Sequence, residues 1–235
     1  MKGRIYLIPV TLGGDDFLKV IPESVINLTI KLRYFIAEDV RSARRYLRMI
    51  DKEFPINDTV FFELSEHTKE TDIAHYLEPI YNGADIGVIS EAGLPAIADP
   101  GAMIIAMAHR KGITVTPLSG PSSIILALIS SGFNGQNFTF NGYLPIKPEQ
   151  RIAKLRELEK KASEGFTQIF METPYRNQKM LESILKTCHN DTLLCIAADI
   201  TLPTESIRTM KISEWKKDLP SLDNRLAVFL FSESI

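Results

Sequence analysis

Short apolar runs alternate with amphipathic stretches along the first half of the chain. Such alternation is typical of α/β proteins in which helices connect parallel strands. The apolar runs predict strands over residues 5–10, 34–37, 60–64, 85–90 and 113–116. The amphipathic stretches predict helices over residues 22–33, 40–50, 69–82 and 102–111. Gly83 and Gly112 follow two of these stretches, at the position where glycine commonly ends a helix.

The second half repeats the alternation without repeating the sequence. Strands are expected over residues 138–143, 166–171, 192–198, 206–212 and 226–231, and helices over 148–163 and 177–188. The two sets of elements meet near residues 117–121, a segment rich in proline. We therefore expect an N-terminal α/β domain over residues 1–117 and a C-terminal α/β domain over residues 118–235.

An uncharged stretch of 35 residues runs from Gly112 to Ile146, although charged residues make up 24% of the chain. Gly, Pro, Ser and Asn interrupt it, so it is not a membrane span. Two interpretations stay open. The stretch is either a buried strand followed by a buried helix, or the wall of a ligand cleft, where small side chains let a ligand approach the backbone.

Composition excludes several classes of protein. The 27 basic and 29 acidic residues give a net charge of −2, whereas a protein that coats nucleic acid needs clustered positive charge. Cys188 and Cys195 fit neither a redox pair nor a zinc site, and the histidines lack ligand spacing, so we expect no metal. No apolar run is long enough for a signal peptide or a membrane span. A cytoplasmic protein without a membrane partner is the expectation.

Two loops rich in glycine and proline follow predicted strands. The first covers residues 90–101, S-E-A-G-L-P-A-I-A-D-P-G, and the second covers residues 117–123, P-L-S-G-P-S-S. In parallel α/β folds, ligands bind beyond the carboxyl ends of strands. The first loop is either a binding loop or an elaborate turn, and it lacks the motifs of dinucleotide and P-loop sites. The second opens a helix, where Ser122 or Ser123 either caps the helix or helps its free amides bind a carboxylate.

Two further groups combine charged side chains. Arg41, Arg44, Arg45 and Arg48 recur at helical spacing, so they share one face of the helix predicted over residues 40–50. This face either contacts phosphates or is a solvated surface paired with nearby carboxylates. Glu172 and Arg176 follow the strand predicted over residues 166–171, where they either bind ligand or pair with each other.

These segments carry five motifs in one order. They are a first strand ending in a glycine turn, E-D-x-R-x-x-R-R-x-L, S-[DE]-A-G-x-P-x-x-x-D-P-G, P-L-x-G-P-S and E-x-P-x-R. Together they resemble the tetrapyrrole methylase superfamily over roughly residues 4–232. Within it, they are most similar to the branch that 2′-O-methylates a cytidine ribose in small-subunit ribosomal RNA.

The resemblance implies a fold, a cofactor and partners. The fold is two α/β domains, the first with a mostly parallel sheet and the second with a mixed sheet, with S-adenosylmethionine (SAM) in a cleft between them. The implied partner is ribosomal RNA or the small ribosomal subunit rather than DNA, and the chain would form a homodimer. The uncharged stretch then becomes one wall of the cleft.

The resemblance also assigns roles to residues. The implied cofactor contacts are Pro9, Gly93, Leu94, Pro95, Ile97, Ser122, Ser123, Ile124, Met171, Ala197 and Leu226. A ribose hydroxyl must lose a proton during methylation, and a carboxylate near the methyl group would accept it. The candidates for this catalytic role are Glu38, Asp39 and Asp99. Substrate contacts are expected from Arg41, Arg44, Arg45, Glu172 and Arg176.

Some motif positions depart from the family pattern. Gly14 stands where asparagine is usual and Leu94 where threonine is usual, while Ala198 and Leu202 replace an arginine and a lysine. These departures keep three alternatives open. The chain could be a SAM-binding regulatory module without methyl transfer, a methylase of a small tetrapyrrole-like substrate, or a plain nucleotide-binding α/β protein.

Overall fold

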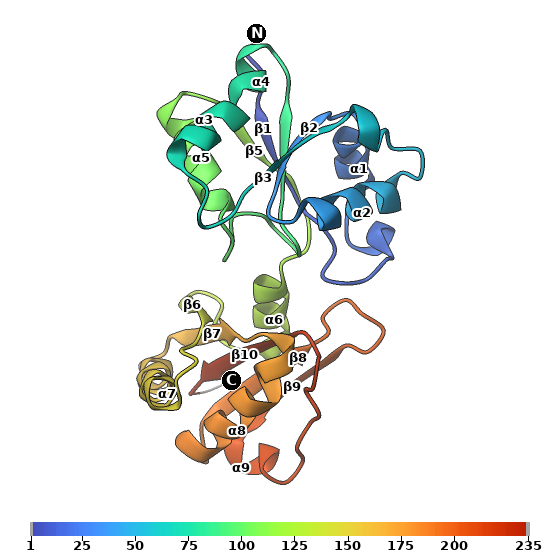
Figure 1. Ribbon diagram of the computed structural model, residues 1–235. Helices are drawn as coiled ribbons and strands as arrows, with labels where there is room; N and C mark the ends of the chain where they lie inside the picture. The colour runs from blue at the N-terminus through green and yellow to red at the C-terminus, as the bar shows by residue number, and fades with distance from the viewer. Residues whose placement is uncertain (1, 234–235) are drawn as a thin grey trace. The chain divides into compact units, whose positions relative to one another are not determined.

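The protein consists of two compact units in a computed structural model that describes residues 2–233 (Figure 1). The first unit ends at Ser122 and the second begins at Ser123. The sequence placed this boundary at residues 117 and 118, at the end of the last strand of the first unit. In the structure, the proline-rich segment that follows that strand packs onto the first unit, through Gly120 against Pro9.

The first unit contains one parallel sheet, as predicted. Its strands run in the order β3-β2-β4-β1-β5, and every neighbouring pair is parallel. The strands are β1 (Ile5–Ile8), β2 (Tyr34–Ala37), β3 (Val60–Glu63), β4 (Ile86–Ile89) and β5 (Val115–Pro117). Apolar side chains alternate between its two faces, because successive residues of a strand point to opposite sides.

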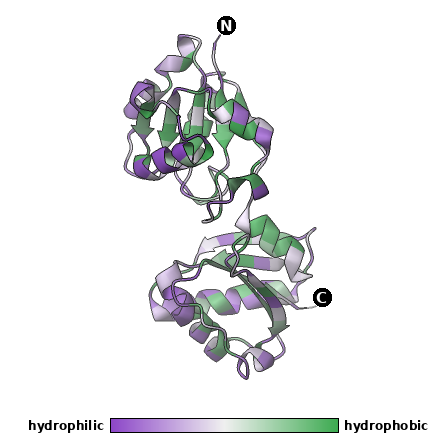
Figure 2. Cartoon of the chain, turned by 90° about the vertical axis from the view of Figure 1, so that its right-hand side faces the viewer, coloured by the Kyte–Doolittle hydropathy of each residue, from purple (hydrophilic) through white to green (hydrophobic). Residues whose placement is uncertain are grey.

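Helices cover both faces of this sheet. They are α1 (Glu23–Thr29), α2 (Val40–Ile50), α3 (Glu70–Tyr76), α4 (Glu78–Tyr81) and α5 (Gly101–Arg110), with short 3-10 turns η1 (Phe17–Lys19) and η2 (Ile56–Asp58). Residues of α2 pack with Phe35 and Ile8 on one face, and residues of α3, α4 and α5 pack with Ile5 and Ile36 on the other. Figure 2 shows the resulting apolar interior.

Two helix predictions in this unit were too long. The stretch predicted over residues 69–82 forms two helices that meet at Leu77. Pro79 explains the break, because proline has no backbone N–H to continue the hydrogen bonding of a helix. The first helix ends at Thr29 rather than near residue 33, and the hydroxyl of Thr29 donates to the carbonyl of Val25 at 2.7 Å.

The second unit contains a mixed sheet, as the family resemblance implied. Its order is β6-β7-β10-β8-β9, in which only the pair β6 and β7 is parallel. The strands are β6 (Phe138–Tyr143), β7 (Thr167–Met171), β8 (Leu193–Ala198), β9 (Ser206–Lys211) and β10 (Ala227–Ser232). All five strands were predicted within two residues at each end.

Helices also flank the sheet of the second unit. They are α6 (Ser123–Ser131), α7 (Pro148–Ser163), α8 (Asn177–Thr187) and α9 (Ile212–Trp215), with the 3-10 turn η3 (Pro174–Arg176). Side chains of α7, α8 and α9 form one core with Phe170, Phe229 and Phe231. Helix α6 contacts β8, β9 and β10. The sequence did not predict α9, because Ile212 continued the apolar pattern of the strand before it.

The uncharged stretch forms β5, α6 and β6. Its apolar residues are not uniformly buried. In α6, Ala127 and Leu128 are buried while Ile129 is 71% exposed. Strand β6 lies at an edge of its sheet and exposes Phe138 and Tyr143. Part of the stretch is therefore accessible on the second unit taken by itself.

Candidate functional site

The first unit has a break in strand order at the carboxyl edge of its sheet. Strands β1 and β4 are neighbours in the sheet. The chain leaves β1 toward β2, which lies beyond β4, whereas it leaves β4 toward β5, which lies beyond β1. The loops after β1 and β4 therefore leave in opposite directions. In open α/β sheets, ligands bind in the crevice that this reversal creates. The predicted cofactor residues Pro9, Gly93, Leu94, Pro95 and Ile97 all lie in these two loops.

Backbone contacts hold the loops at this edge together. The amide of Val10 donates to the carbonyl of Gly93 at 2.9 Å. The loop after β5 joins them at Gly120, where a Cβ atom would lie 2.1 Å from Cβ of Pro9. The hydroxyl of Tyr46, from α2, donates to the carbonyl of Pro9 at 3.0 Å. Segments far apart in sequence therefore meet at Pro9 and Val10.

The loop after β4 is held in an unusual backbone conformation. Gly93, Ala96 and Ala98 have φ values of 69°, 69° and 61°, in the left-handed region. For the two alanines this region costs about 1–2 kcal/mol each. The carboxylate of Asp99 stabilises the loop, because it accepts hydrogen bonds from the amide of Ala96 at 2.8 Å and from that of Gly101 at 2.7 Å. Residues strained in this way are common at ligand clamps.

The three predicted catalytic carboxylates have different surroundings. Asp99 is half-buried, and burial raises its pKa despite the backbone amides that lower it. Asp39 caps α2, accepting from the amide and hydroxyl of Ser42 at 2.8 and 2.6 Å, and these bonds hold its pKa below the usual value. Both carboxylates therefore stabilise local backbone structure, Asp39 at the start of α2 and Asp99 in the loop after β4.

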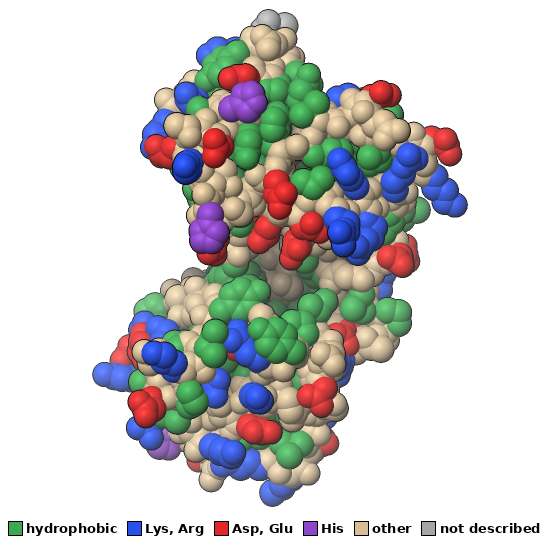
Figure 3. Space-filling view, viewed as in Figure 1, with side chains coloured by type: hydrophobic (Ala, Val, Ile, Leu, Met, Phe, Trp, Pro, Cys, Tyr) green, Lys and Arg blue, Asp and Glu red, His purple; other side chains and the backbone are tan. Residues whose placement is uncertain are grey.

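Glu38 is the third candidate, and among the described residues its carboxylate accepts no backbone hydrogen bond that would give it such a structural role. It directly follows β2, next to the end of β4. The residue as a whole is exposed, while its carboxyl group is partly buried. Partial burial raises the pKa of Glu38, and the charges of Glu91 and Asp99 raise it further. Within residues 2–233 neither Glu38 nor Glu91 forms a salt bridge. Figure 3 shows acidic side chains gathered at the lower edge of this unit, next to basic side chains over α2.

The arginines of α2 form an exposed basic face. All four side chains, from Arg41, Arg44, Arg45 and Arg48, are exposed. In the part of the chain that the structure describes, none of them forms a salt bridge with a carboxylate. The guanidinium of Arg44 lies 5.0 Å from the ring centroid of Phe61, and Arg48 donates to the carbonyl of Lys52. The pairing with nearby carboxylates, such as Asp51 or Glu53, that was the alternative interpretation of this face is not observed among the described residues.

The remaining cofactor candidates lie in or next to the second unit. Ser122 is the last residue of the first unit, while Ser123 begins α6 and Ile124 is buried in it. Met171 and Ala197 both pair with Val228 of β10, so the three residues form one row across the sheet. Leu226 directly precedes β10 and is 45% exposed.

Two arginine–carboxylate pairs lie at the edge of the second sheet where β7 and β8 end and β10 begins, which we call its carboxyl edge. Glu172, whose side chain is 1% exposed, accepts from Arg176 at 2.5 Å, so these residues pair with each other. Asp199 accepts from Arg225 at 2.7 Å and lies in the left-handed region, with φ of 52°. Its other carboxylate oxygen accepts from the amide of Leu226 at 3.2 Å. Each buried carboxylate thus has a cation beside it.

The sequence analysis missed the second pair. Asp199 stands in a segment that resembles a family motif, which was a usable signal, but Arg225 belongs to no motif. Tyr175, one of the three residues between Glu172 and Arg176, was not predicted as a site residue either, and it is 70% exposed. Exposure of one aromatic side chain in a short turn cannot be read from periodicity.

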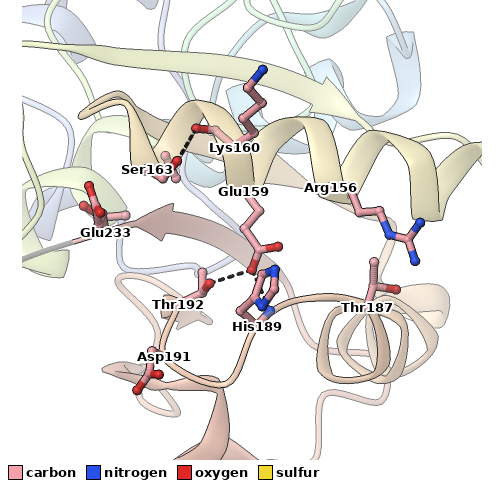
Figure 4. Close-up of a pocket in the computed structure, with 11 residues that line it drawn as sticks. Arg156, Glu159, Lys160, Ser163, Thr187, His189, Asp191, Thr192 and Glu233 are labelled. Atoms are coloured by element: carbon pink, nitrogen blue, oxygen red, sulfur yellow. Dashed lines mark hydrogen bonds between the residues drawn. The ribbon is translucent and has the colours of Figure 1, made fainter.

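A pocket of about 730 Å³ on the second unit contains none of the predicted site residues. It lies among α7, the turn before β8 and the end of β10 (Figure 4). Glu159 points into the turn and accepts from the amide of His189 and the hydroxyl of Thr192. Its lining mixes basic and acidic side chains, so we interpret Glu159 as a structural link between α7 and the turn.

Metal and thiol chemistry have no support within residues 2–233. No three His, Cys, Asp or Glu side chains there gather in an arrangement that could hold a metal ion. Cys188 and Cys195 are buried and unbridged, and burial raises their pKa values to about 12 and about 11. Such thiols are not nucleophilic near neutral pH. The same part of the chain has no helix that is long and apolar enough to cross a membrane.

Known proteins share both the sequence pattern and the fold. A family model described as Tetrapyrrole (Corrin/Porphyrin) Methylases matches residues 30–216. Ribosomal RNA small subunit methyltransferase I of Vibrio cholerae is 29% identical over 94% of this chain and 73% of its own length. The protein of the same name from Xylella fastidiosa is 33% identical over 87% of this chain and 71% of its own length. The crystal structure of the methyltransferase CobJ superposes with a TM-score of 0.63 at 16% identity, covering 98% of this chain and 94% of that one.

Proposed function

The chain belongs to the tetrapyrrole methylase family and is a methyltransferase that uses SAM as methyl donor, and from this premise we propose that it methylates a cytidine ribose hydroxyl in small-subunit ribosomal RNA. The relatives that cover most of the chain carry this proposal, since they are named for ribosomal RNA of the small subunit. A homodimer and a cytoplasmic location stay predictions.

The carboxyl edge of the first unit fits the cofactor. Gly93 and Gly120 let the loops at this edge pack closely, because a Cβ atom on them would approach Leu12 to 3.1 Å and Pro9 to 2.1 Å, so the edge presents backbone atoms to a ligand. The carboxylates of Glu38 and Glu91 at the same edge suit a ligand that carries a sulfonium cation and an ammonium group. When bound, SAM supplies an electrophilic methyl group. The contacts predicted from the second unit, at Met171, Ala197 and Leu226, stay a prediction.

We assign the role of general base to Glu38. The oxygens of Asp39 and Asp99 already accept backbone hydrogen bonds that hold α2 and the strained loop, and protonating them would disrupt those elements. Glu38 has no such bonds among those of the described residues, and its raised pKa brings it closer to the operating pH, which favours proton transfer. It would accept the proton of the ribose hydroxyl as the oxygen attacks.

The basic face of α2 is the proposed contact for RNA phosphates. Guanidinium groups bind phosphates through several N–H donors, and those of α2 are exposed and form no salt bridge with any carboxylate that the structure describes. A local face of this kind is compatible with a net charge of −2, because the basic residues are concentrated next to the acidic edge. Such contacts position a nucleic acid without reading its sequence.

The test is transfer of labelled methyl groups from SAM to purified small ribosomal subunits, followed by mapping of the modified ribose. Wild-type protein should label one cytidine. The double variant Arg44→Ala, Arg45→Ala should lower labelling about tenfold or more at moderate salt and weaken its salt dependence, because phosphate contacts release counterions. Glu38→Gln should lower kcat about 100-fold with SAM affinity kept.

Other outcomes would favour the alternatives. Protein that binds SAM but never forms S-adenosylhomocysteine with ribosomal subunits would be a regulatory module. Transfer to a corrin or porphyrin but not to RNA would identify a small-substrate methylase. Binding of ATP without binding of SAM would refute the cofactor as well.

A further inference from the structure

Tyr175 presents an aromatic ring to solvent at the carboxyl edge of the second sheet. It lies in η3, between the end of β7 and the start of α8, and is 70% exposed. The guanidinium carbon of Arg176 lies 5.5 Å from the centroid of its ring. The ring lies next to residues expected to contact substrate, and its exposed face is a surface that a flat ligand can cover.

The cation beside this ring is fixed in place. Arg176 donates to the carboxylate of Glu172 at 2.5 Å and to the hydroxyl of Thr173 at 3.0 Å. The side chain of Glu172 is almost fully buried, so it cannot follow the arginine into solvent. A guanidinium held at both its Nε and Nη atoms restricts the ring that it contacts. The contact with Arg176 therefore favours one orientation of Tyr175 before a ligand arrives, which lowers the entropic cost of binding.

The chemistry of the ring selects a flat, electron-poor partner. Nucleobases stack on exposed tyrosine rings, and this stacking is the usual way in which proteins hold unstacked bases of RNA. The two buried carboxylates at this edge do not oppose a nucleic acid, because Glu172–Arg176 and Asp199–Arg225 each sum to zero. The same edge carries Leu226, a predicted cofactor contact.

We propose that Tyr175 is a stacking platform for an unstacked nucleobase of the RNA substrate. The proposal rests on the proposed function, because it takes RNA to be the substrate. Proteins that recognise RNA by sequence bind unstacked bases of loops and bulges, and an aromatic platform compensates for the lost base stacking. Tyr175 is then a substrate-binding residue, and Arg176 and Glu172 position it.

A second tyrosine provides a matched control. Tyr81 is 45% exposed, and the ammonium of Lys2 lies 5.2 Å from its ring centroid, so it too combines an exposed ring with a cation. It ends α4, just before β4, and therefore lies at the amino edge of the first sheet rather than at a carboxyl edge. Tyr81→Ala removes the same side chain from a place without a predicted ligand.

The experiment compares Tyr175→Ala, Tyr175→Phe and Tyr81→Ala in methyl transfer to small ribosomal subunits, with SAM affinity measured by calorimetry and mass by light scattering. Tyr175→Ala should raise the KM for subunits about tenfold or more, since one stacked base contributes about that much. Tyr175→Phe should stay within about twofold of wild type, because stacking needs the ring and not the hydroxyl. SAM affinity and mass should not change, and Tyr81→Ala should behave like wild type.

Three results would overturn the platform. They are an unchanged KM in Tyr175→Ala, a loss of SAM affinity, which would place the cofactor on the ring, and a changed mass, which would place a second copy of the chain there. If wild-type protein does not methylate subunits, the proposed function fails. The stacking platform is then tested separately, by binding of a labelled single-stranded oligoribonucleotide to the wild type and the two alanine variants. Weaker binding by Tyr175→Ala but not by Tyr81→Ala would keep the platform, and equal binding would refute it.

Discussion

The carboxyl edges of the two sheets are built by different means. At the edge of the first sheet, loops meet through backbone atoms and glycines, and a carboxylate holds the strained loop by accepting backbone amides. At the edge of the second sheet, buried carboxylates pair with arginines, as in Glu172–Arg176 and Asp199–Arg225. Among residues 2–233, Glu38 and Glu91 at the first edge form no salt bridge, whereas the carboxylates buried at the second edge are each paired with an arginine.

This difference separates two kinds of binding surface. An edge made of backbone and small residues fits a ligand by shape, and its unpaired carboxylates favour a cationic one. At an edge fixed by ion pairs, the paired groups neutralise each other, so the exposed ring of Tyr175 is the feature available for binding a ligand. The comparison predicts that the first edge is sensitive to added volume and the second to lost charge.

The largest effect should come from added volume at Gly120. In Gly120→Ala the new Cβ would lie 2.1 Å from Cβ of Pro9, and neither backbone can move without separating the loops after β1 and β5. We expect a loss of about 3 kcal/mol in unfolding free energy, at the upper end of overpacking effects, and a large loss of SAM affinity. Chemical denaturation and calorimetry measure the two quantities.

Gly135→Ala is the matched control for this substitution. A Cβ there would meet nothing within 4 Å, so stability and SAM affinity should match wild type. If Gly120→Ala bound SAM as tightly as Gly135→Ala does, the meeting of loops at Pro9 would not form the cofactor site.

Lost charge in the second unit should have the next largest effect. Asp199→Asn leaves Arg225 without its carboxylate in a largely buried place, where the side chains are 9% and 26% exposed. We expect a loss of about 2 kcal/mol, below the full cost for a completely buried pair. Asp218→Asn breaks the exposed pair with Arg208, at 64% and 43% exposure, and should cost at most about 1 kcal/mol. Equal losses in denaturation would show that burial does not distinguish the two ion pairs.

The sequence was informative about the first edge and much less so about the second. Apolar periodicity and the positions of Gly93 and Asp99 predicted a loop after a buried strand, because glycine and aspartate mark backbone geometry locally. Arg225 lies 26 positions from its partner Asp199, and nothing near it in sequence requires a buried carboxylate. Tertiary pairs of this kind leave no periodic signal.

A smaller effect should follow from removing the carboxylate that holds the strained loop. Asp99→Ala leaves the amides of Ala96 and Gly101 without their acceptor, and we expect a loss of about 1 kcal/mol, at the low end because the loop is partly exposed. Ala96→Gly in the same background should recover part of it, since glycine adopts a φ of 69° without strain. Denaturation of the single and double variants measures both. Failure of glycine to recover any stability would mean that Asp99 does not act through the loop conformation.

The smallest effect should be a shift in pH dependence caused by Glu91. As a general base, Glu38 must be deprotonated, so kcat/KM rises as pH passes through its pKa, which lies above the ordinary value of 4.5. Glu91→Gln removes a negative charge that raises this pKa, so the acid limb of the kcat/KM profile should move to lower pH.

The same substitution should change how stability depends on pH. A carboxyl with a raised folded-state pKa stabilises the fold below its unfolded pKa and loses that contribution as pH rises through the folded value. Glu91→Gln should therefore also reduce the loss of stability over that interval. Glu53→Gln, at an exposed position elsewhere in the unit, should change neither curve. An acid limb that moves in Glu53→Gln as much as in Glu91→Gln would show net charge acting at long range, and one that moves in neither would remove Glu38 as the base.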